Sequence, residues 1–570
     1  MAALPTNGSV VQAPRSVHVG LDIGTYASGF AFSERAAPVR CHESWPDQTK
    51  PYPKTRSIIL YKARHVLLCC KTPVAFGWSA LKELAKVPQQ EQKSYSLIDA
   101  SVFKLGLHDP SRAAKLPPGL TAVQRASGHH PMVRVFLEYP QIPWRKPKHS
   151  HPTWILPSMA KWIPLPWILC RCMTVPAMWG DASKHAMREA ALRAGFIHKL
   201  DSDALSIILE PEAAAIYALD KKAPPLLSEF LVAFPMGLLS RGLQICLTGE
   251  SVMVIDAGGG TVDTTIHVCQ SKGGHVVLAE AVHAAGALSG SVMVDEEFKI
   301  VVSGSFANNL FTRAEQPDLM AEGYIPHSDH TAGPAAAWEA GLGGQGEGYA
   351  YIGLHGTHSM MIILVLLVGG FASSPYLQLC WTLGRQASLW CPPALTPLSF
   401  QVLLAGIHPE FIHARRSKLS YGVKLCIPYQ PGYPGMFTHR ETGELMTDKG
   451  FKLFVSKDEM VELDSTTQHT VSPLYSNQSA VSIPVYASDR CGSSINFSCT
   501  AHPRYVDDAE PDTRKTSAVV QVQIPPSYID ARDASIRVQM LFGRTELVLK
   551  AWEAKSGLPV QTSIKFAHAL

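Results

Sequence analysis

Short apolar runs that end in an aspartate followed by glycine recur along the first half of the chain. Residues 17–24 predict a strand that ends in a tight turn, and residues 252–256 repeat this pattern before three consecutive glycines. A second apolar segment follows each turn, at residues 30–32 and 264–268, and predicts the returning strand of a hairpin. The chain therefore repeats a strand–turn–strand unit.

The interval between the two predicted hairpins alternates strands with helices. An apolar segment that ends at Pro176 predicts a buried strand, and Asp181 is placed to cap a helix that ends near Gly195. Residues 207–209 predict a further strand, and Glu210 begins a helix that is entered through proline. This order is typical of an α/β fold.

The pattern changes beyond residues 428–435, which are rich in proline and glycine and predict a boundary loop. Short β-type segments follow, separated by turn residues, and predict a mainly antiparallel β domain. These segments are residues 451–455, 481–486, 519–524, 536–542 and 546–551.

A chain of 570 residues is too long for one compact core, so we expect more than one domain. The pattern predicts a disordered tail at residues 1–15 and a two-lobed α/β domain at residues 16–427. Its lobes divide near residues 210–250. A β-rich domain is predicted at residues 436–570.

Composition narrows the class of protein. Apolar residues make up 46% and charged residues 17%, as in a globular protein. The net charge is only +4 and the basic residues are scattered, so we expect no nucleic-acid partner. The longest apolar run, residues 360–368, is too short to span a bilayer, so we expect no membrane partner. The dispersed cysteines and the polar N-terminus indicate a cytoplasmic protein with reduced thiols.

An aspartate before glycine and threonine suits a phosphate site. A phosphate approaches the backbone closely only where side chains are small, and glycine permits turns that aim several N–H groups at one anion. Threonine adds a hydroxyl donor, and an aspartate at the strand end can hold Mg²⁺ through water. Two such turns facing each other would clamp the β- and γ-phosphates of a nucleotide.

The two turns differ in how specific they are. The turn from Asp22 to Thr25 resembles many structural strand–turn–strand units and is a weak signal by itself. The turn between Asp256 and Asp263 holds three consecutive glycines, which have little structural use. The pair, in this order and with a helix between them, favours a nucleotide site.

These motifs resemble the actin/hexokinase/heat-shock ATPase superfamily. Within it the chain resembles the seventy-kilodalton heat-shock proteins, and specifically their divergent heat shock 70 kDa protein 12 group. The resemblance implies a two-lobed actin-like (ribonuclease H-like) ATPase fold followed by a β-rich C-terminal domain. It is collinear from about residue 17 to about 425, on residues 20–32, 174–179, 208–215, 256–263, 294–298, 367–372 and 415–423.

The resemblance implies Mg²⁺ and ATP or ADP as cofactors, and it assigns the residues around them. Asp22 and Asp256 would lie around the metal. The first phosphate loop would be Gly24, Thr25 and Tyr26, and the second would be Gly258, Gly259, Gly260 and Thr261.

The resemblance also assigns residues to catalysis and to the adenosine. Asp263 and Glu210 would orient the attacking water, with Asp263 as candidate base, and Lys104 would neutralise the γ-phosphate. Gly369 and Gly370 would lie against the adenosine, and Gly290 would approach it from the other lobe.

Three of these assignments have a plain structural alternative. Lys104 could be a solvated surface lysine, Glu210 could merely start its helix, and residues 369–370 could form an ordinary strand-to-helix turn.

The chain also departs from the family pattern. Tyr26 stands where the typical members have a second threonine, and residues 298–364 show no cluster of Glu with Lys or Arg like the one that normally encloses the adenine. Residues 154–172 and 220–248 look like insertions, and residues 301–360 have no clean period.

The leading hypothesis is an ATP-binding, slowly hydrolysing, chaperone-like protein with a Mg-ATP cleft between two lobes. Its partners would be nucleotide and protein clients or co-chaperones. The alternative is a nucleotide-binding pseudo-ATPase scaffold without turnover, which the departures favour. A small-molecule kinase on the same fold is a third hypothesis, and no motif for a second substrate supports it.

Overall fold

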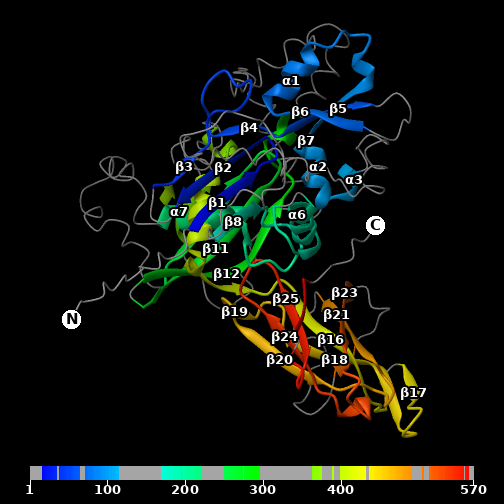
Figure 1. The fold of residues 1–570 in the computed structure, drawn as a ribbon. Helices are drawn as coiled ribbons and strands as arrows, with labels where there is room; N and C mark the ends of the chain where they lie inside the picture. The colour runs from blue at the N-terminus through cyan, green and yellow to red at the C-terminus, as the bar shows by residue number, and fades with distance from the viewer. Residues whose placement is uncertain are drawn as a thin grey trace, which may run out of the picture.

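The computed structural model describes fourteen stretches of the chain (Figure 1). These are residues 16–34, 38–63, 71–113, 168–193, 196–219, 249–273, 275–295, 362–374, 388–390, 398–431, 435–488, 504–505, 513–557 and 559–563. The predicted tail at residues 1–15 and the segments 220–248 and 301–360 lie outside them.

The first lobe is built on a mixed sheet whose order is β3-β2-β1-β8-β9. β1 runs antiparallel to β2 and parallel to β8, which is parallel to β9. The strands are β1 (Ser16–Ile23), β2 (Ala27–Glu34), β3 (Arg40–Cys41), β4 (Lys54–Arg56), which pairs with β2, β8 (Ile168–Val175) and β9 (Leu205–Leu209).

The second lobe repeats that strand order when its sheet is followed from the opposite edge. Its sheet begins β14-β13-β10-β11-β12, so that β10 takes the place of β1, β11 that of β2 and β13 that of β8. β10 runs antiparallel to β11 and parallel to β13, as β1 does to β2 and β8. The strands are β10 (Ser251–Ala257), β11 (Val262–Lys272), β12 (His275–Ala287), β13 (Ile362–Val368), β14 (Ser388–Trp390), β15 (Ile412–Arg416) and β19 (Met460–Glu462). The predicted two-lobed α/β architecture is therefore confirmed by two sheets of equivalent order.

Two helices lie between the sheets. α7 (Glu210–Leu219) follows β9, and α13 (Leu398–Ile407) packs against both α7 and β1. Gly20 permits the close approach of α13, because a Cβ there would lie 2.5 Å from the backbone nitrogen of Leu403. Buried alanines of α7 complete a core with strands of both lobes, so this core joins the lobes.

A small sheet, β6-β5-β7, projects from the first lobe (Figure 1). Helix α1 covers it with Ala80, which packs on Ile58 and Leu60. The elements are β5 (Ile58–Ala63), β6 (Lys71–Phe76), β7 (Tyr95–Asp99), α1 (Trp78–Ala85), η1 (Gln92–Ser94), α2 (Ala100–Phe103), η2 (Leu105–Leu107) and α3 (Pro110–Ala113).

The C-terminal part contains two antiparallel sheets around one apolar core, as predicted for a β-rich region. One sheet has the order β17-β18-β16-β21-β23, with β22 paired to β18, and the other has the order β20-β24-β25-β26. The strands are β16 (Ser420–Pro428), β17 (Met436–Thr438), β18 (Leu445–Val455), β20 (Thr466–Val471), β21 (Ala480–Ser488), β22 (Arg504–Tyr505), β23 (Thr513–Gln523), β24 (Ile536–Leu541), β25 (Val548–Glu553) and β26 (Pro559–Ser563).

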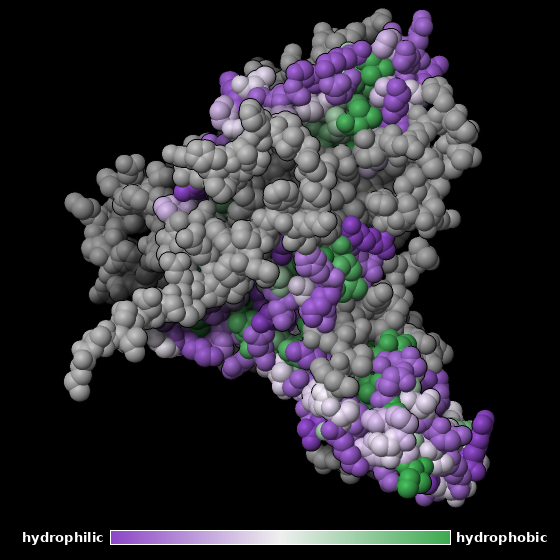
Figure 2. All heavy atoms as spheres, viewed as in Figure 1, coloured by the Kyte–Doolittle hydropathy of each residue, from purple (hydrophilic) through white to green (hydrophobic). Residues whose placement is uncertain are grey.

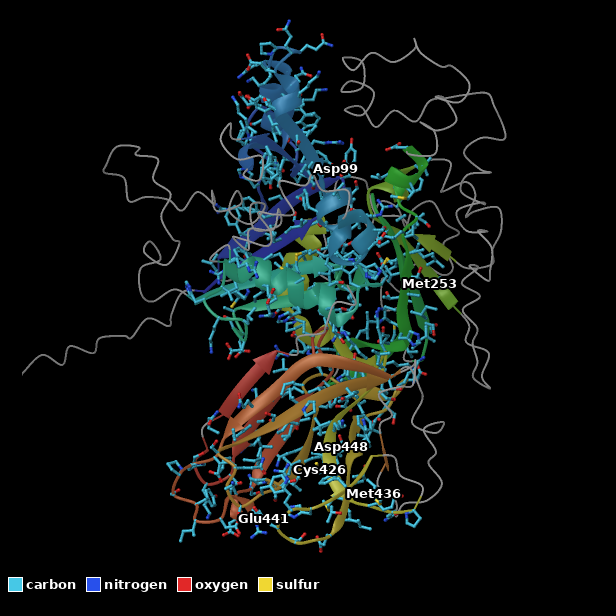
Figure 3. The ribbon with its side chains drawn as sticks, turned by 90° about the vertical axis from the view of Figure 1, so that its right-hand side faces the viewer. Asp99, Met253, Cys426, Met436, Glu441 and Asp448 are labelled. Atoms are coloured by element: carbon cyan, nitrogen blue, oxygen red, sulfur yellow. The ribbon has the colours of Figure 1, made fainter. Side chains whose placement is uncertain are left out.

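Met436 and Glu441 lie at the end of these sheets that points away from the lobes (Figure 3). On the face drawn in Figure 2, the described residues are mainly hydrophilic with separate hydrophobic spots.

Among the described helices, none is both long and apolar enough to cross a membrane. The remaining helical elements are α6 (Asp181–Arg193) and the 3₁₀ turns η5 (Phe371–Ser373), η6 (Pro409–Phe411) and η7 (Ala531–Asp533).

Some local predictions were wrong. Residues 168–172 are not part of an insertion, because they form most of β8 and pair with β1. Asp181 is the first residue of α6 rather than its cap, and its carboxylate accepts a hydrogen bond from the hydroxyl of Tyr421. β16 precedes the predicted boundary loop yet pairs with β18 and β21 of the C-terminal part.

Candidate functional site

The two glycine-containing turns lie directly against each other. A Cβ on Gly260 would lie 2.6 Å from Oγ1 of Thr25, and a Cβ on Gly259 would lie 3.1 Å from Cβ of Tyr26. Because a real Cβ needs more room than this, the second turn can approach the first only without side chains at these positions. The two predicted phosphate loops are thus brought face to face.

The aspartates of the two turns occupy equivalent positions in the two lobes. Asp22 lies near the end of β1 opposite Gly29 of β2, and Asp256 lies near the end of β10 opposite Asp263 of β11. All three carboxylates are buried. Since equivalent strands carry them, the repeated fold itself places these carboxylates on either side of the contact between the loops.

The second loop is supported by the turn that follows β12. The N–H of Gly258 donates to the carbonyl of Thr261 at 2.9 Å, and the N–H of Val292 donates to the carbonyl of Gly259 at 2.8 Å. A Cβ on Gly290 would lie 2.5 Å from the backbone of Gly259. Gly290, predicted beside the adenosine, therefore packs against the second predicted phosphate loop.

The first loop is held by a residue that the sequence did not single out. The Ser57 hydroxyl donates to the carbonyl of Gly24 at 2.7 Å, and the Ser57 N–H donates to the carbonyl of Tyr26 at 3.0 Å. The guanidinium of Arg56 stacks over the Tyr26 ring at 3.8 Å from its centre. No motif pointed to residues 56–57, because their role depends on tertiary contact with the loop.

Lys104 and Glu210 form a buried ion pair. Nζ of Lys104 lies 2.9 Å from Oε1 of Glu210, although the two residues are 106 positions apart in sequence. Both side chains are buried. The alternative of a solvated surface lysine is therefore wrong, and Glu210 does more than begin its helix.

Asp263 is a buried carboxylate with one fixed oxygen. Its Oδ1 accepts a hydrogen bond from the N–H of Met178 at 2.9 Å. Gly286, opposite it on β12, leaves room for it, because a Cβ there would lie 2.3 Å from the same oxygen. Burial, together with the charge of Glu210, raises the pKa of Asp263 to about 7.

Asp256 is surrounded by other carboxylates. Burial raises its pKa well above the usual range, and the charges of Glu210 and Asp263 add to this effect. Gly369, which has a φ of +92°, allows the chain to pass close by, because a Cβ there would lie 2.3 Å from Oδ1 of Asp256. Gly369 thus contacts the candidate metal aspartate.

Asp22 has a partner that the sequence analysis missed. Nζ of Lys54, in β4, lies 2.6 Å from Oδ2 of Asp22. The contact could not be foreseen, because 32 positions separate the two residues and β4 is only three residues long.

The carboxylates fit a magnesium ion that keeps much of its water. Oδ1 of Asp22 and Oδ2 of Asp256 are buried and accept no hydrogen bond from the described residues. Among the described residues, no three Asp, Glu, His or Cys side chains lie close enough together to hold a metal ion as a group. Mg²⁺ typically takes one or two carboxylates and retains several waters, so these oxygens suit it.

The adenosine side of the site is described only in part. Gly370 follows Gly369 at the surface, and a Cβ on Gly370 would meet no atom within 4 Å. Most of residues 298–364, where the resemblance implies the adenine contacts, lies outside the described residues.

The chain is similar to heat shock 70 kDa proteins along nearly its whole length. It is 25% identical to heat shock 70 kDa protein 12B of Homo sapiens over 665 aligned positions, which cover 97% of this chain and 92% of that protein. It is 24% identical to heat shock 70 kDa protein 12A of Homo sapiens and of Mus musculus, with the same coverage. No protein-family model matches the chain. The predicted resemblance to this group is confirmed.

Two solved structures are among those that match the chain. MreB5 of Spiroplasma citri bound to ADP matches with a TM-score of 0.37 and 12% identity, over 70% of this chain and 96% of that one. A non-polymerisable pCBH ParM mutant matches with a TM-score of 0.36 and 11% identity, over 69% and 98%. These scores are too low to carry an argument, so the fold assignment rests on the equivalent strand orders of the two lobes.

Proposed function

We propose that the chain binds ATP and ADP with Mg²⁺ between its two lobes. One observation carries the proposal: two glycine-containing turns, at equivalent positions of two equivalent sheets, face each other beside buried aspartates. Backbone N–H groups in such turns bind phosphate oxygens, and glycine lets the phosphate approach them. The similarity to heat shock 70 kDa proteins supports the same conclusion.

In the proposed complex, the turns bind the phosphates and the aspartates bind the metal ion. Residues 24–26 and 258–261 would hold the phosphates through backbone N–H groups and the hydroxyls of Thr25 and Thr261. Asp22 and Asp256 would hold Mg²⁺ through water. When bound, this ion would neutralise phosphate charge and fix the orientation of the phosphates.

Slow hydrolysis is the proposed activity of the bound nucleotide. Lys104, held in place by Glu210 at 2.9 Å, would stabilise negative charge on the γ-phosphate. Asp263 would accept a proton from the attacking water, and the N–H of Met178 would keep its carboxylate oriented. These roles resemble those in other phosphoryl-transfer enzymes, where catalysis is mostly positioning and electrostatic stabilisation.

The finer proposal is that the nucleotide state influences the C-terminal sheets and, through them, protein clients or co-chaperones. Helix α7 supports this because it carries Glu210 at its start and Glu212 two residues later. Glu212 forms a bidentate ion pair with Arg415, with distances of 2.7 and 3.0 Å. Arg415 also donates to the carbonyl of Gly543 in the C-terminal part. Residues 16–427 and 436–570 would be the coupled domains.

Calorimetric titration of the full chain with Mg-ATP, Mg-ADP and AMP tests the binding proposal. Because the turns are proposed to hold the β- and γ-phosphates, we expect both ATP and ADP to bind. AMP should bind at least about 100-fold more weakly, which corresponds to a loss of roughly 3 kcal/mol of binding free energy. Equal affinity for all three nucleotides, or no binding to folded protein, would contradict it.

A further inference from the structure

Lys54, Gly29 and Asp22 form one row across three neighbouring strands. Gly29 of β2 is opposite Asp22 of β1 on one side and opposite Lys54 of β4 on the other. Neighbouring strands lie about 4.8 Å apart, so the lysine must reach across a whole strand to meet the aspartate. It does so, because its Nζ lies 2.6 Å from Oδ2 of Asp22.

Gly29 leaves the path of the lysine open. A Cβ on Gly29 would lie 3.1 Å from Cγ of Lys54 and 2.4 Å from the carbonyl oxygen of Pro53. A larger residue in the middle of this row would therefore displace both the stem of the lysine and the start of β4. The backbone register and the glycine together direct the ammonium group to Asp22.

The second lobe has no corresponding cation in its own row. There the equivalent row is Asp256, Asp263 and Gly286, so a glycine stands where the first lobe has Lys54. The two halves of the site consequently differ in charge, although their strands are equivalent. Of these two rows, the one that contains Asp22 carries the positive charge.

The position of the ammonium group matters because of what it neutralises. Asp22 is fully buried, and a buried carboxylate is costly unless a cation compensates it. Nucleotide phosphates entering between the loops would bring further negative charge close to this carboxylate. An ammonium group carries three N–H donors, so Lys54 can bind Asp22 and still donate to a phosphate oxygen.

We propose that Lys54 is a built-in cation of the phosphate site, which neutralises Asp22 through Oδ2 and donates to a phosphate oxygen beside the hydrated Mg²⁺ ion, so that ADP stays bound when Mg²⁺ is removed. This inference rests on the proposed nucleotide binding and specifies its cation requirement. Nucleotide affinity should therefore depend only weakly on Mg²⁺. Replacing Lys54 by an uncharged residue should make the same binding strongly dependent on Mg²⁺.

The test measures ADP affinity by calorimetry in excess MgCl₂ and in excess EDTA. For the unmodified chain we expect dissociation constants within about fivefold of each other, a difference of roughly 1 kcal/mol. For Lys54→Met we expect EDTA to weaken binding by about 50-fold or more, with most of the affinity restored by MgCl₂. Lys54→Arg, which keeps the positive charge, should behave like the unmodified chain.

Lys86→Met is the matched control, since Lys86 is an exposed lysine paired with Glu83 in the same lobe. It should leave both affinities unchanged. The inference is overturned if the unmodified chain already loses about 50-fold in EDTA, or if Lys54→Met shows no added dependence on Mg²⁺.

The comparison also separates this inference from the proposed function. Binding that occurs only with MgCl₂ overturns the role of Lys54 and leaves nucleotide binding intact. Absence of ADP binding under both conditions overturns both. If Lys54→Met does not fold, a loss of about 50-fold in EDTA by the unmodified chain still overturns the inference.

Discussion

At the scale of single residues, several charged side chains are buried and matched with specific partners. Lys104 is paired with Glu210, and Lys54 is paired with Asp22. Buried charges are costly unless they are compensated, so such pairs are retained where their chemistry is useful. The partners lie far apart in sequence, which is why the motifs predicted Asp22 and Glu210 but neither of these contacts.

Asp263→Asn should separate hydrolysis from binding. The amide keeps the shape of the side chain but cannot accept the proton of the attacking water, so we expect single-turnover hydrolysis to slow about 100-fold or more. ADP affinity should change by less than about threefold, or roughly 0.7 kcal/mol.

Rapid-quench measurement of the first turnover provides the comparison. Equal rates at the background level for the variant and the unmodified chain would favour the scaffold without turnover over the slow ATPase.

Glu553 gives a residue-scale prediction about stability. Its carboxylate accepts hydrogen bonds from the N–H groups of Lys555 and Ser556 and from the hydroxyl of Tyr528. Burial opposes ionisation, but these hydrogen bonds outweigh it and lower the pKa of Glu553 from 4.5 to about 2. The ionised form therefore stabilises the folded protein.

Because the folded pKa lies below the unfolded one, this stabilisation is complete above about pH 4.5 and is lost as the pH falls toward 2. Glu553→Gln should lower the free energy of unfolding by about 1–2 kcal/mol at pH 7. The difference from the unmodified chain should shrink between pH 4.5 and 2 in urea titrations. If the difference in the free energy of unfolding does not change with pH, the charge of Glu553 does not stabilise the fold. Glu83→Gln is the control, because Glu83 belongs to an exposed ion pair.

At the scale of elements, the hairpins of the two lobes were predicted well because their signals are local. An apolar run, an aspartate and glycines specify the strand and its turn without help from distant residues. β4 and β19 were not predicted, since each has three residues and depends on pairing with a distant strand. β8 was misjudged at its start because Arg171 interrupts the apolar run, although that residue lies within the strand.

Gly290→Ala tests whether the turn after β12 supports the second phosphate loop. The added methyl group would lie 2.5 Å from the backbone of Gly259 and Gly260, which cannot move aside as a side chain could. We expect ADP affinity to fall at least about tenfold, or 1.4 kcal/mol. Gly180→Ala is the matched control, because a Cβ there would meet no atom within 4 Å. Calorimetry that shows equal affinities for both variants would contradict this role.

At the scale of the whole molecule, charged side chains of the lobes form ion pairs and hydrogen bonds with the C-terminal part. Arg188 of α6 forms an ion pair with Glu546 at 2.6 Å, and Nζ of Lys184 donates to the carbonyl of Thr545 at 2.9 Å. Arg415 joins Glu212 to the carbonyl of Gly543. These contacts were beyond prediction from the sequence, because they join segments more than 100 residues apart.

Arg415→Met should destabilise the molecule strongly. It leaves the buried Glu212 carboxylate without its cation, and breaking such a pair costs about 3–5 kcal/mol. The double variant Glu212→Gln/Arg415→Met should be more stable than Arg415→Met alone, since it removes the stranded charge. Urea unfolding gives the comparison, with Arg532→Met at an exposed pair as control. The account is wrong here if Arg415→Met costs no more than that control.

The central claim is that nucleotide phosphates bind between the two facing turns. A crystal structure of the full chain with Mg-ADP tests this claim most directly. We expect the β-phosphate to contact backbone N–H groups of both residues 24–26 and residues 258–261, with Asp22 and Asp256 directed toward the hydrated Mg²⁺ ion beside it. ADP bound elsewhere, or contacting only one of the two turns, would contradict the account.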